Sequence, residues 1–75
     1  MERAMSEMMV QVNSQPTKIP EHASLKDVLT QFGINEETPG IAVALNTQVV
    51  PREHWPRAAL KERDDIVIVT ATQGG

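Results

Sequence analysis

Residues 24–33, SLKDVLTQFG, decide the fold, because they carry every signal of one short helix. Ser24 stands at an N-cap position, and Asp27 follows three residues later, where the helix dipole favours a carboxylate. Apolar residues then recur at i, i+3, i+4 and i+7. This spacing predicts one buried helix face, made by Leu25, Val28, Leu29 and Phe32. Gly33 suits the left-handed cap that ends such a helix.

The residues before the helix are typical of a β-hairpin between Met8 and Ile19. The stretch MVQV alternates, so Val10 and Val12 share one buried face. NSQP predicts the turn, and TKI the second strand. Residues 1–7 have no periodicity, and we expect them to be a disordered lead.

The residues after the helix predict two more strands. IAVALN, residues 41–46, places its large side chains on one face, toward the helix, and Ala42 and Ala44 on a more open face. A turn at Asn46 and Thr47 leads to the short strand TQVV. REHW lies between Pro51 and Pro56, which favours a turn or a 3₁₀ segment over an α-helix.

The last part of the chain predicts a central strand. RAALKERDD, residues 57–65, is expected to include one helical turn and a tight acidic entry into IVIVTA. That run is apolar at successive positions, which predicts a strand buried on both faces. The chain is therefore expected to form an α+β domain over residues 8–71, a mixed sheet of four to five strands on one main helix, with a flexible tail at 72–75.

Composition excludes several classes of function. The chain has 75 residues, no cysteine, a net charge of −3 and only two aromatic side chains, Phe32 and Trp55. An acidic chain with so few aromatic rings is a poor binder of nucleic acid. Its apolar runs are far shorter than the ~20 residues of a membrane helix. We therefore expect a cytoplasmic domain that binds neither nucleic acid nor membrane.

The sequence also argues against an enzyme. His22 and His54 are isolated from each other, and nothing in their spacing indicates a metal site. The adjacent acidic pairs, Glu36–Glu37 and Asp64–Asp65, are typical of a solvated loop and a turn. We expect neither a catalytic cleft nor a bound metal in so small a domain.

The stretch VPREHWPR, residues 50–57, allows two interpretations. Trp55 can cover one end of the core, with Arg52 solvated nearby. Tryptophan and arginine are also favoured at the centre of protein interfaces, so the same stretch can contact a partner. The two interpretations are compatible.

The chain ends in Gly74–Gly75. A C-terminal carboxylate becomes reactive when another enzyme joins it to AMP, and its last residues must then pass through a narrow channel. Glycine has no side chain to obstruct that passage and no β-carbon to restrict the backbone. A small domain without a catalytic pocket would then be the carrier of a reactive end.

Two stretches resemble a known family. ALNTQVVPREHW, residues 44–55, and RDDIVIVTATQGG, residues 63–75, are similar to the ThiS family of ubiquitin-like β-grasp sulfur carriers. The residues typical of that branch are Asn46, Val50, Pro51, Arg52 and Trp55. Asp64 stands where the family usually has glycine.

The resemblance implies a mechanism. A ThiF-type adenylyltransferase, using ATP and Mg²⁺, would adenylate the Gly75 carboxylate, with Gly74 giving steric access. Sulfur from a cysteine desulfurase or another donor would convert it to a thiocarboxylate for thiazole synthase. The carrier itself would bind no cofactor and is expected to be a monomer when free. The residues expected to contact partners are Ala42, Ala44, Arg52, Trp55, Val69, Ala71, Thr72 and Gln73.

Three alternatives remain at this point. The small subunit of molybdopterin synthase is also a β-grasp carrier that ends in Gly–Gly. A ubiquitin-like modifier would use the same tail for conjugation to lysines. An interaction module would have a glycine terminus by chance and would tolerate the loss of Gly75.

Overall fold

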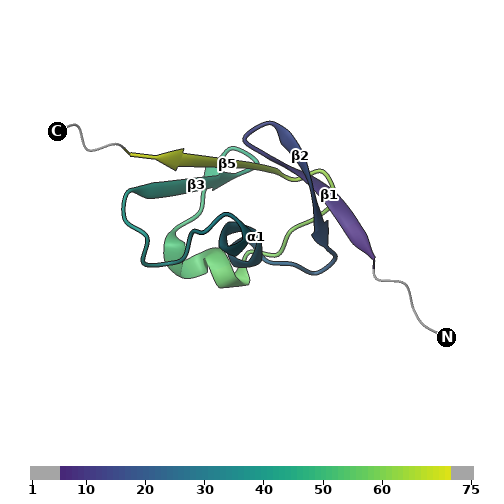
Figure 1. Ribbon diagram of the computed structural model, residues 1–75, viewed down its shortest axis with the longest axis horizontal. Helices are drawn as coiled ribbons and strands as arrows, with labels where there is room; N and C mark the ends of the chain where they lie inside the picture. Colours follow the sequence, from purple (N-terminus) through teal and green to yellow (C-terminus); the bar gives the residue numbers. More distant parts are fainter. Residues whose placement is uncertain (1–5, 72–75) are drawn as a thin grey trace.

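A computed structural model describes residues 6–71 of the chain. They form a five-stranded mixed sheet in the order β2-β1-β5-β3-β4, with β1 and β5 parallel and the other neighbours antiparallel. The helix α1 (Leu25–Gln31) and the 3₁₀ helix η1 (Arg52–Arg57) lie together on one side of this sheet (Figure 1). The α+β class and the mixed sheet on one main helix are confirmed, with five strands.

The hairpin joins β1 (Glu7–Val12) to β2 (Gln15–Pro20) through only two residues. Asn13 and Ser14 have φ values of 51° and 70°, as in the type I′ turn that suits the strand twist. The turn is thus tighter than expected from NSQP, because Pro16 already belongs to β2. A proline is tolerated there since β2 is an edge strand.

The start of α1 is fixed by a reciprocal capping box, as its sequence predicted. The Asp27 amide donates to Ser24 Oγ at 3.2 Å, and the Ser24 amide donates to Asp27 Oδ2 at 2.9 Å. These bonds satisfy amides that have no partner within the helix. The capping box therefore sets the residue at which α1 begins.

The end of α1 is a two-bond glycine cap. Gly33 has φ +78°, and its amide donates to Thr30 O at 3.0 Å. The Ile34 amide donates to Leu29 O at 2.9 Å, which completes the pattern of a Schellman motif. The expectation that Phe32 is buried with the helix face is wrong, since this C-cap residue is 49% exposed. Its backbone has left the helical region, so its ring lies at the end of the helix rather than under it.

The second half of the sheet contains β3 (Ile41–Leu45), β4 (Gln48–Val49) and β5 (Asp65–Thr70). Asn46 and Thr47 form the predicted turn, with φ values of 50° and 72°. β5 is central, as predicted, because it pairs with β1 on one edge and with β3 on the other.

Residues 57–65 contain no helical turn beyond the end of η1, so that expectation is wrong. After η1 ends at Arg57, the chain runs extended, and Ala59 forms an isolated β-bridge with Ser24. The Leu25 amide donates to Ala58 O, and the Leu60 amide to Ala23 O. This segment therefore satisfies part of its backbone by pairing with the chain before α1, and its last residues form a turn in which the Asp64 amide donates to Lys61 O at 3.1 Å.

The core lies between the helices and the covered face of the sheet. Its fully buried side chains are Trp55, Ile19, Leu25, Leu29, Ile66, Val10, Val28 and Val43. Within residues 6–71, every buried side-chain nitrogen or oxygen has a hydrogen-bond partner. The domain is thus held by one small, fully satisfied core.

We expect Ser24→Ala to lower the free energy of unfolding by about 1 kcal/mol, because it removes one half of the capping box. In a domain of this size, that loss lowers the melting temperature by roughly 4–8 °C. Thermal unfolding followed by circular dichroism measures it. Ser6→Ala is the control, since Ser6 is exposed and should shift unfolding by no more than about 0.5 kcal/mol. Equal shifts for both variants would contradict the role given to the cap.

Candidate functional site

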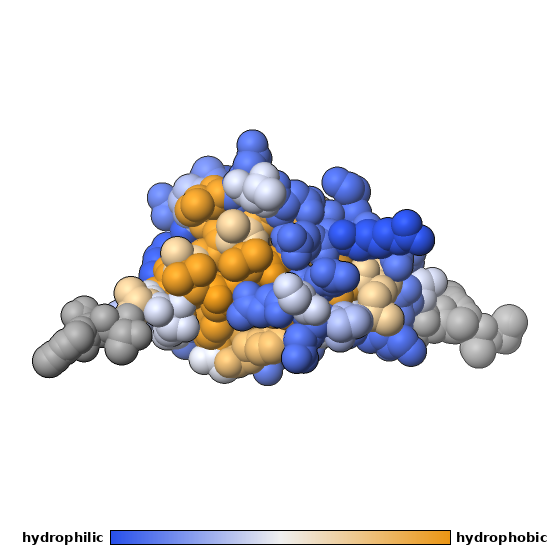
Figure 2. Space-filling view, turned by 90° about the horizontal axis from the view of Figure 1, so that it is seen from above, coloured by the Kyte–Doolittle hydropathy of each residue, from blue (hydrophilic) through white to orange (hydrophobic). Residues whose placement is uncertain are grey.

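The uncovered face of the sheet carries an apolar patch, made of Ala42, Ala44, Val49, Val67 and Val69. The strand register places Ala42 opposite Val69, and Ala44 between Val49 and Val67. Val49 is 72% exposed, Val69 55% and Val67 39%. Figure 2 shows apolar side chains gathered toward the end of the molecule where β5 finishes. Such a contiguous exposed patch, rimmed by polar residues, is typical of a protein-binding surface.

Three residues expected to contact partners lie together in this patch: Ala42, Ala44 and Val69. Val67 and Val49 were not among the predicted contact residues. Val67 belongs to the run IVIVTA, which was expected to be buried on both faces, and Val49 lies on the short strand TQVV, for which no face was predicted. That expectation is wrong, since only Ile66 of β5 is fully buried. One main helix covers only one face of a sheet, which leaves the other face of β5 exposed.

The patch lies beside the last residues that the structure describes. Ala71 follows β5, and its amide donates to Gly40 O at 2.7 Å. Thr72, Gln73, Gly74 and Gly75 lie outside the described residues, so their predicted roles stay predictions. Ala71 therefore marks the point from which the chain continues toward its terminal glycines.

Gly40 is required where it pairs with Ala71. Its φ is +71°, a region that disfavours residues with a side chain. A β-carbon there would also lie 3.2 Å from the carbonyl oxygen of Ala71. A larger residue at position 40 would therefore have a strained backbone and would force the Ala71 carbonyl to move.

The Arg52 side chain is occupied by backbone carbonyls. Its Nη1 donates to Glu36 O at 2.7 Å and Thr38 O at 2.8 Å, and its Nη2 donates to Ile41 O at 3.1 Å. This planar fork joins the loop after α1 to the start of β3. Its predicted contact with a partner is untested, whereas its role inside the domain is visible in these bonds.

Trp55 is buried, with 1% of its surface exposed. Its indole Nε1 donates to Val50 O at 3.0 Å, and the Arg52 guanidinium lies 5.3 Å from the ring centroid. A cation at this distance over an indole face is an attractive cation–π contact. Of the two interpretations of VPREHWPR, the one in which Trp55 covers the core is therefore favoured, and the indole presents almost no surface to a partner.

Asn46 connects the β3–β4 turn to the start of β5. Its Nδ2 donates to Asp64 Oδ1 at 2.9 Å, and its Oδ1 accepts from the Asp65 amide at 2.9 Å. The buried Asp64 also accepts from the Lys61 amide at 2.7 Å. The Asp64 carboxylate therefore closes the turn before β5.

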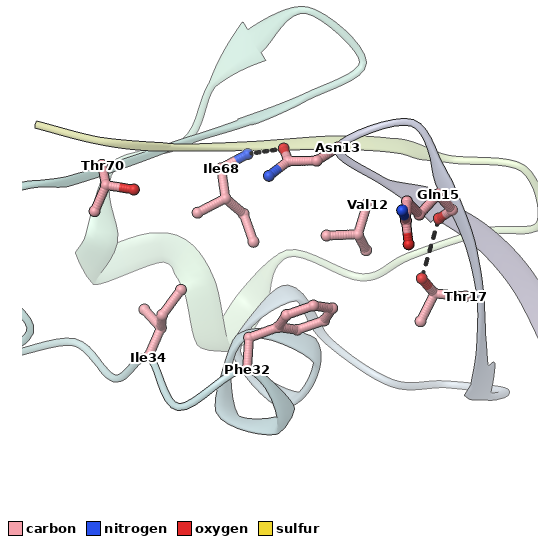
Figure 3. A pocket seen from close by; sticks show the side chains of 8 residues that line it. All are labelled: Val12, Asn13, Gln15, Thr17, Phe32, Ile34, Ile68 and Thr70. Atoms are coloured by element: carbon pink, nitrogen blue, oxygen red, sulfur yellow. Dashed lines mark hydrogen bonds between the residues drawn. The ribbon is translucent and has the colours of Figure 1, made fainter.

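A hollow lies between the end of α1 and the edge of β5 that follows its pairing with β1 (Figure 3). Phe32 and Ile34 face Val12 and Ile68 across it, and its volume is about 370 Å³. The Asn13 side chain closes its rim by accepting the Ile68 amide at 2.7 Å. The hollow holds no charged or catalytic side chain among its lining residues.

Residues 6–71 contain no group of three or more His, Asp or Glu side chains placed to hold a metal ion. His22 and His54 are both exposed. No helix in this part of the chain is long and apolar enough to cross a membrane. The apolar patch and the adjoining end of β5 are therefore the features with functional potential.

We expect Trp55→Ala to cost about 3–5 kcal/mol, because it empties the largest buried site of the core. That loss is comparable with the roughly 4–11 kcal/mol expected for the whole domain. Circular dichroism during urea denaturation measures it. Phe32→Ala is the matched control, since this half-exposed ring is the only other aromatic residue. A Trp55→Ala loss no greater than that of Phe32→Ala would contradict the burial described here.

Comparison with known proteins identifies the architecture and the family. The fold matches the crystal structure of the thiamine biosynthesis protein ThiS from Geobacter metallireducens, with a TM-score of 0.74 and 23% sequence identity, covering 91% of this chain and all of that one. This match confirms the β-grasp fold. The sulfur carrier protein ThiS of Escherichia coli is 28% identical over 68 residues, which is 91% of this chain and all of the relative. The model of the ThiS family matches residues 7–75, and the chain therefore belongs to the ThiS family.

Proposed function

We propose that this protein is a sulfur carrier for the synthesis of the thiazole half of thiamine. The observation that carries the proposal is the family match, which extends through Gly74–Gly75 to the last residue of the chain. The curated relative from Escherichia coli is itself a sulfur carrier. The chain would thus act as a co-substrate of other enzymes and not as a catalyst.

The reaction takes place at the carboxylate of Gly75. Its oxygen attacks the α-phosphorus of ATP in a ThiF-type adenylyltransferase, which uses Mg²⁺, and pyrophosphate leaves. The terminal sulfur of a persulfide, supplied by a cysteine desulfurase or another donor, then displaces AMP at the carbonyl carbon. A thiol cleaves the resulting acyl disulfide and leaves a thiocarboxylate, the sulfur that thiazole synthase would use.

Glycine at both terminal positions suits this chemistry. The tail must bring its carboxyl carbon against ATP, and side chains at positions 74 and 75 would hinder that approach. The chain has no cysteine, so the transferred sulfur is held by the terminal carbonyl alone. Binding to the partner then compensates the entropy lost when the tail is ordered.

The apolar patch is the surface by which we expect partners to hold the domain. It lies on β3, β4 and β5, and β5 leads directly to the tail. An enzyme bound there would have the chain end directed into it. The family match favours the thiamine pathway over the molybdopterin pathway, since the matched family and the curated relative are both ThiS.

We expect deletion of Gly75 to abolish adenylation and to leave the melting temperature unchanged, because the described core does not include that residue. Intact mass measures the result after incubation with the adenylyltransferase, ATP and a sulfur donor. Only the full-length chain should gain the mass of one sulfur-for-oxygen exchange. Gly75→Ala is the matched variant, since it restores the length but adds a methyl group, and it should react more slowly. Normal activation of the truncated chain would disprove the proposal.

We expect the double variant Val67→Ser and Val69→Ser to raise the KM for the carrier in adenylation by about 30-fold, because each exchange removes roughly 1 kcal/mol of apolar contact and the two together remove roughly 2 kcal/mol. The kcat should stay unchanged, since the tail is intact. Met9→Ser is the control, an exposed residue of the same sheet face that lies on β1, outside the patch. Equal effects of the control and the double variant would show that the patch is not the docking surface.

A further inference from the structure

The Arg52 side chain takes the place of a strand where β4 stops. The last backbone bond on that edge of β3 runs from the Val50 amide to Val43 O. The next carbonyl on the same edge, Ile41 O, accepts from Arg52 Nη2 at 3.1 Å. The guanidinium therefore continues the hydrogen-bond ladder by one position and supports the first residue of β3.

The same guanidinium holds the loop that precedes β3. Its Nη1 binds Glu36 O and Thr38 O, within a loop that is closed by a bond from the Asn35 amide to Thr38 Oγ1 at 3.0 Å. Beneath the guanidinium lies the buried ring of Trp55. The loop and the start of β3 are thus tied to the core through one side chain.

The opposite edge of this segment receives the end of β5. Ile41 pairs with Thr70, and Gly40 O accepts the Ala71 amide at 2.7 Å. A β-carbon on Gly40 would meet Ala71 O at 3.2 Å, so a larger residue there would displace this close pairing by a few tenths of an ångström. A continuous series of contacts therefore runs from Trp55 through Arg52 and the loop to Ala71, the residue just before the tail.

We propose that Arg52 and Gly40 are positioning residues that set the direction in which the tail leaves the domain. The inference rests on the proposed function, because it concerns how Gly75 reaches the adenylating enzyme. On this inference, the motif VPREHW affects the reaction by directing the tail. Trp55 then needs no contact with a partner.

The expected effect falls on kcat and not on KM. The apolar patch, which would set the affinity, does not include Arg52 or Gly40. A tail that leaves in another direction would still allow docking, but the carboxylate would reach ATP in fewer of the complexes. Reactions between positioned groups are sensitive to displacements of about 1 Å, which can cost up to about 100-fold in rate.

The first test compares Gly40→Ala with Gly33→Ala. Both glycines have positive φ, 71° and 78°, so both variants carry the same kind of backbone strain. A β-carbon on Gly33 meets nothing within 4 Å, whereas one on Gly40 meets Ala71. We expect both variants to unfold at lower temperature, but only Gly40→Ala to lower the kcat of adenylation, by about tenfold, with KM unchanged.

The second test uses Arg52→Gln and Arg52→Lys, with Arg57→Gln as the control, an exposed cation of the same 3₁₀ helix. Arg52→Gln should lower kcat by about tenfold, and Arg52→Lys should restore part of it, because an ammonium group can donate to some of the three carbonyls but lacks the planar fork. Arg57→Gln should leave kcat and KM unchanged. Amide hydrogen exchange supplies a readout that does not depend on the enzyme. The Ala71 amide should exchange about tenfold faster in Arg52→Gln and by a smaller factor in Arg52→Lys, and the Val28 amide of α1 should be unaffected.

The outcomes separate this inference from the proposed function. If the wild-type chain is not adenylated, the proposed function fails, and the exchange at Ala71 still tests whether Arg52 holds the end of β5. If the wild type is adenylated and the Arg52 and Gly40 variants keep its kcat, the inference is overturned. Equal acceleration of exchange at Ala71 and Val28 would also overturn it, because it would mean general destabilisation.

Discussion

A single helix of seven residues covers a sheet of five strands, and the rest of the structure depends on this constraint. The covered face must contain the whole core, so Trp55 of the 3₁₀ helix packs over the area that α1 does not reach. The opposite face remains uncovered, and its valines are exposed. The small area covered by α1 therefore explains both the burial of Trp55 and the exposure of the apolar patch.

The two halves of the sheet serve different purposes. The hairpin and the parallel pair of β1 with β5 bury Val10, Val12 and Ile66 and anchor the domain. The pair of β3 with β5 exposes the patch and leads to the C-terminal residues. Arg52 secures the start of β3 to the buried Trp55 ring of the core. A few side-chain-to-backbone bonds thus connect the core to the strand beside the end of β5.

Local signals in the sequence predicted the elements that are stabilised locally. Ser24, Asp27 and Gly33 indicated the helix, and its capping bonds span only a few residues. The exposure of Val67 could not be read from the run IVIV by itself, because an apolar run does not show how many of its faces are covered. That follows from the single main helix, which covers only one face of the sheet. The role of Arg52 was also hidden, since its partners lie 11 to 16 residues away and leave no periodic pattern. Gly74 and Gly75 indicated a function because residues without side chains suit a reactive chain end, and not because they predicted any element of the fold.

Asn13 in the hairpin turn has a consequence for solubility. Within the described chain, β1 ends at Val12, so the last part of β5 has no strand beside it on that edge. An exposed strand edge beside apolar side chains invites pairing with other molecules and aggregation. The Asn13 side chain occupies the Ile68 amide at 2.7 Å and so removes one donor from that edge. The Asn13 side chain thereby limits the edge-to-edge pairing that an open strand beside an exposed apolar face would promote.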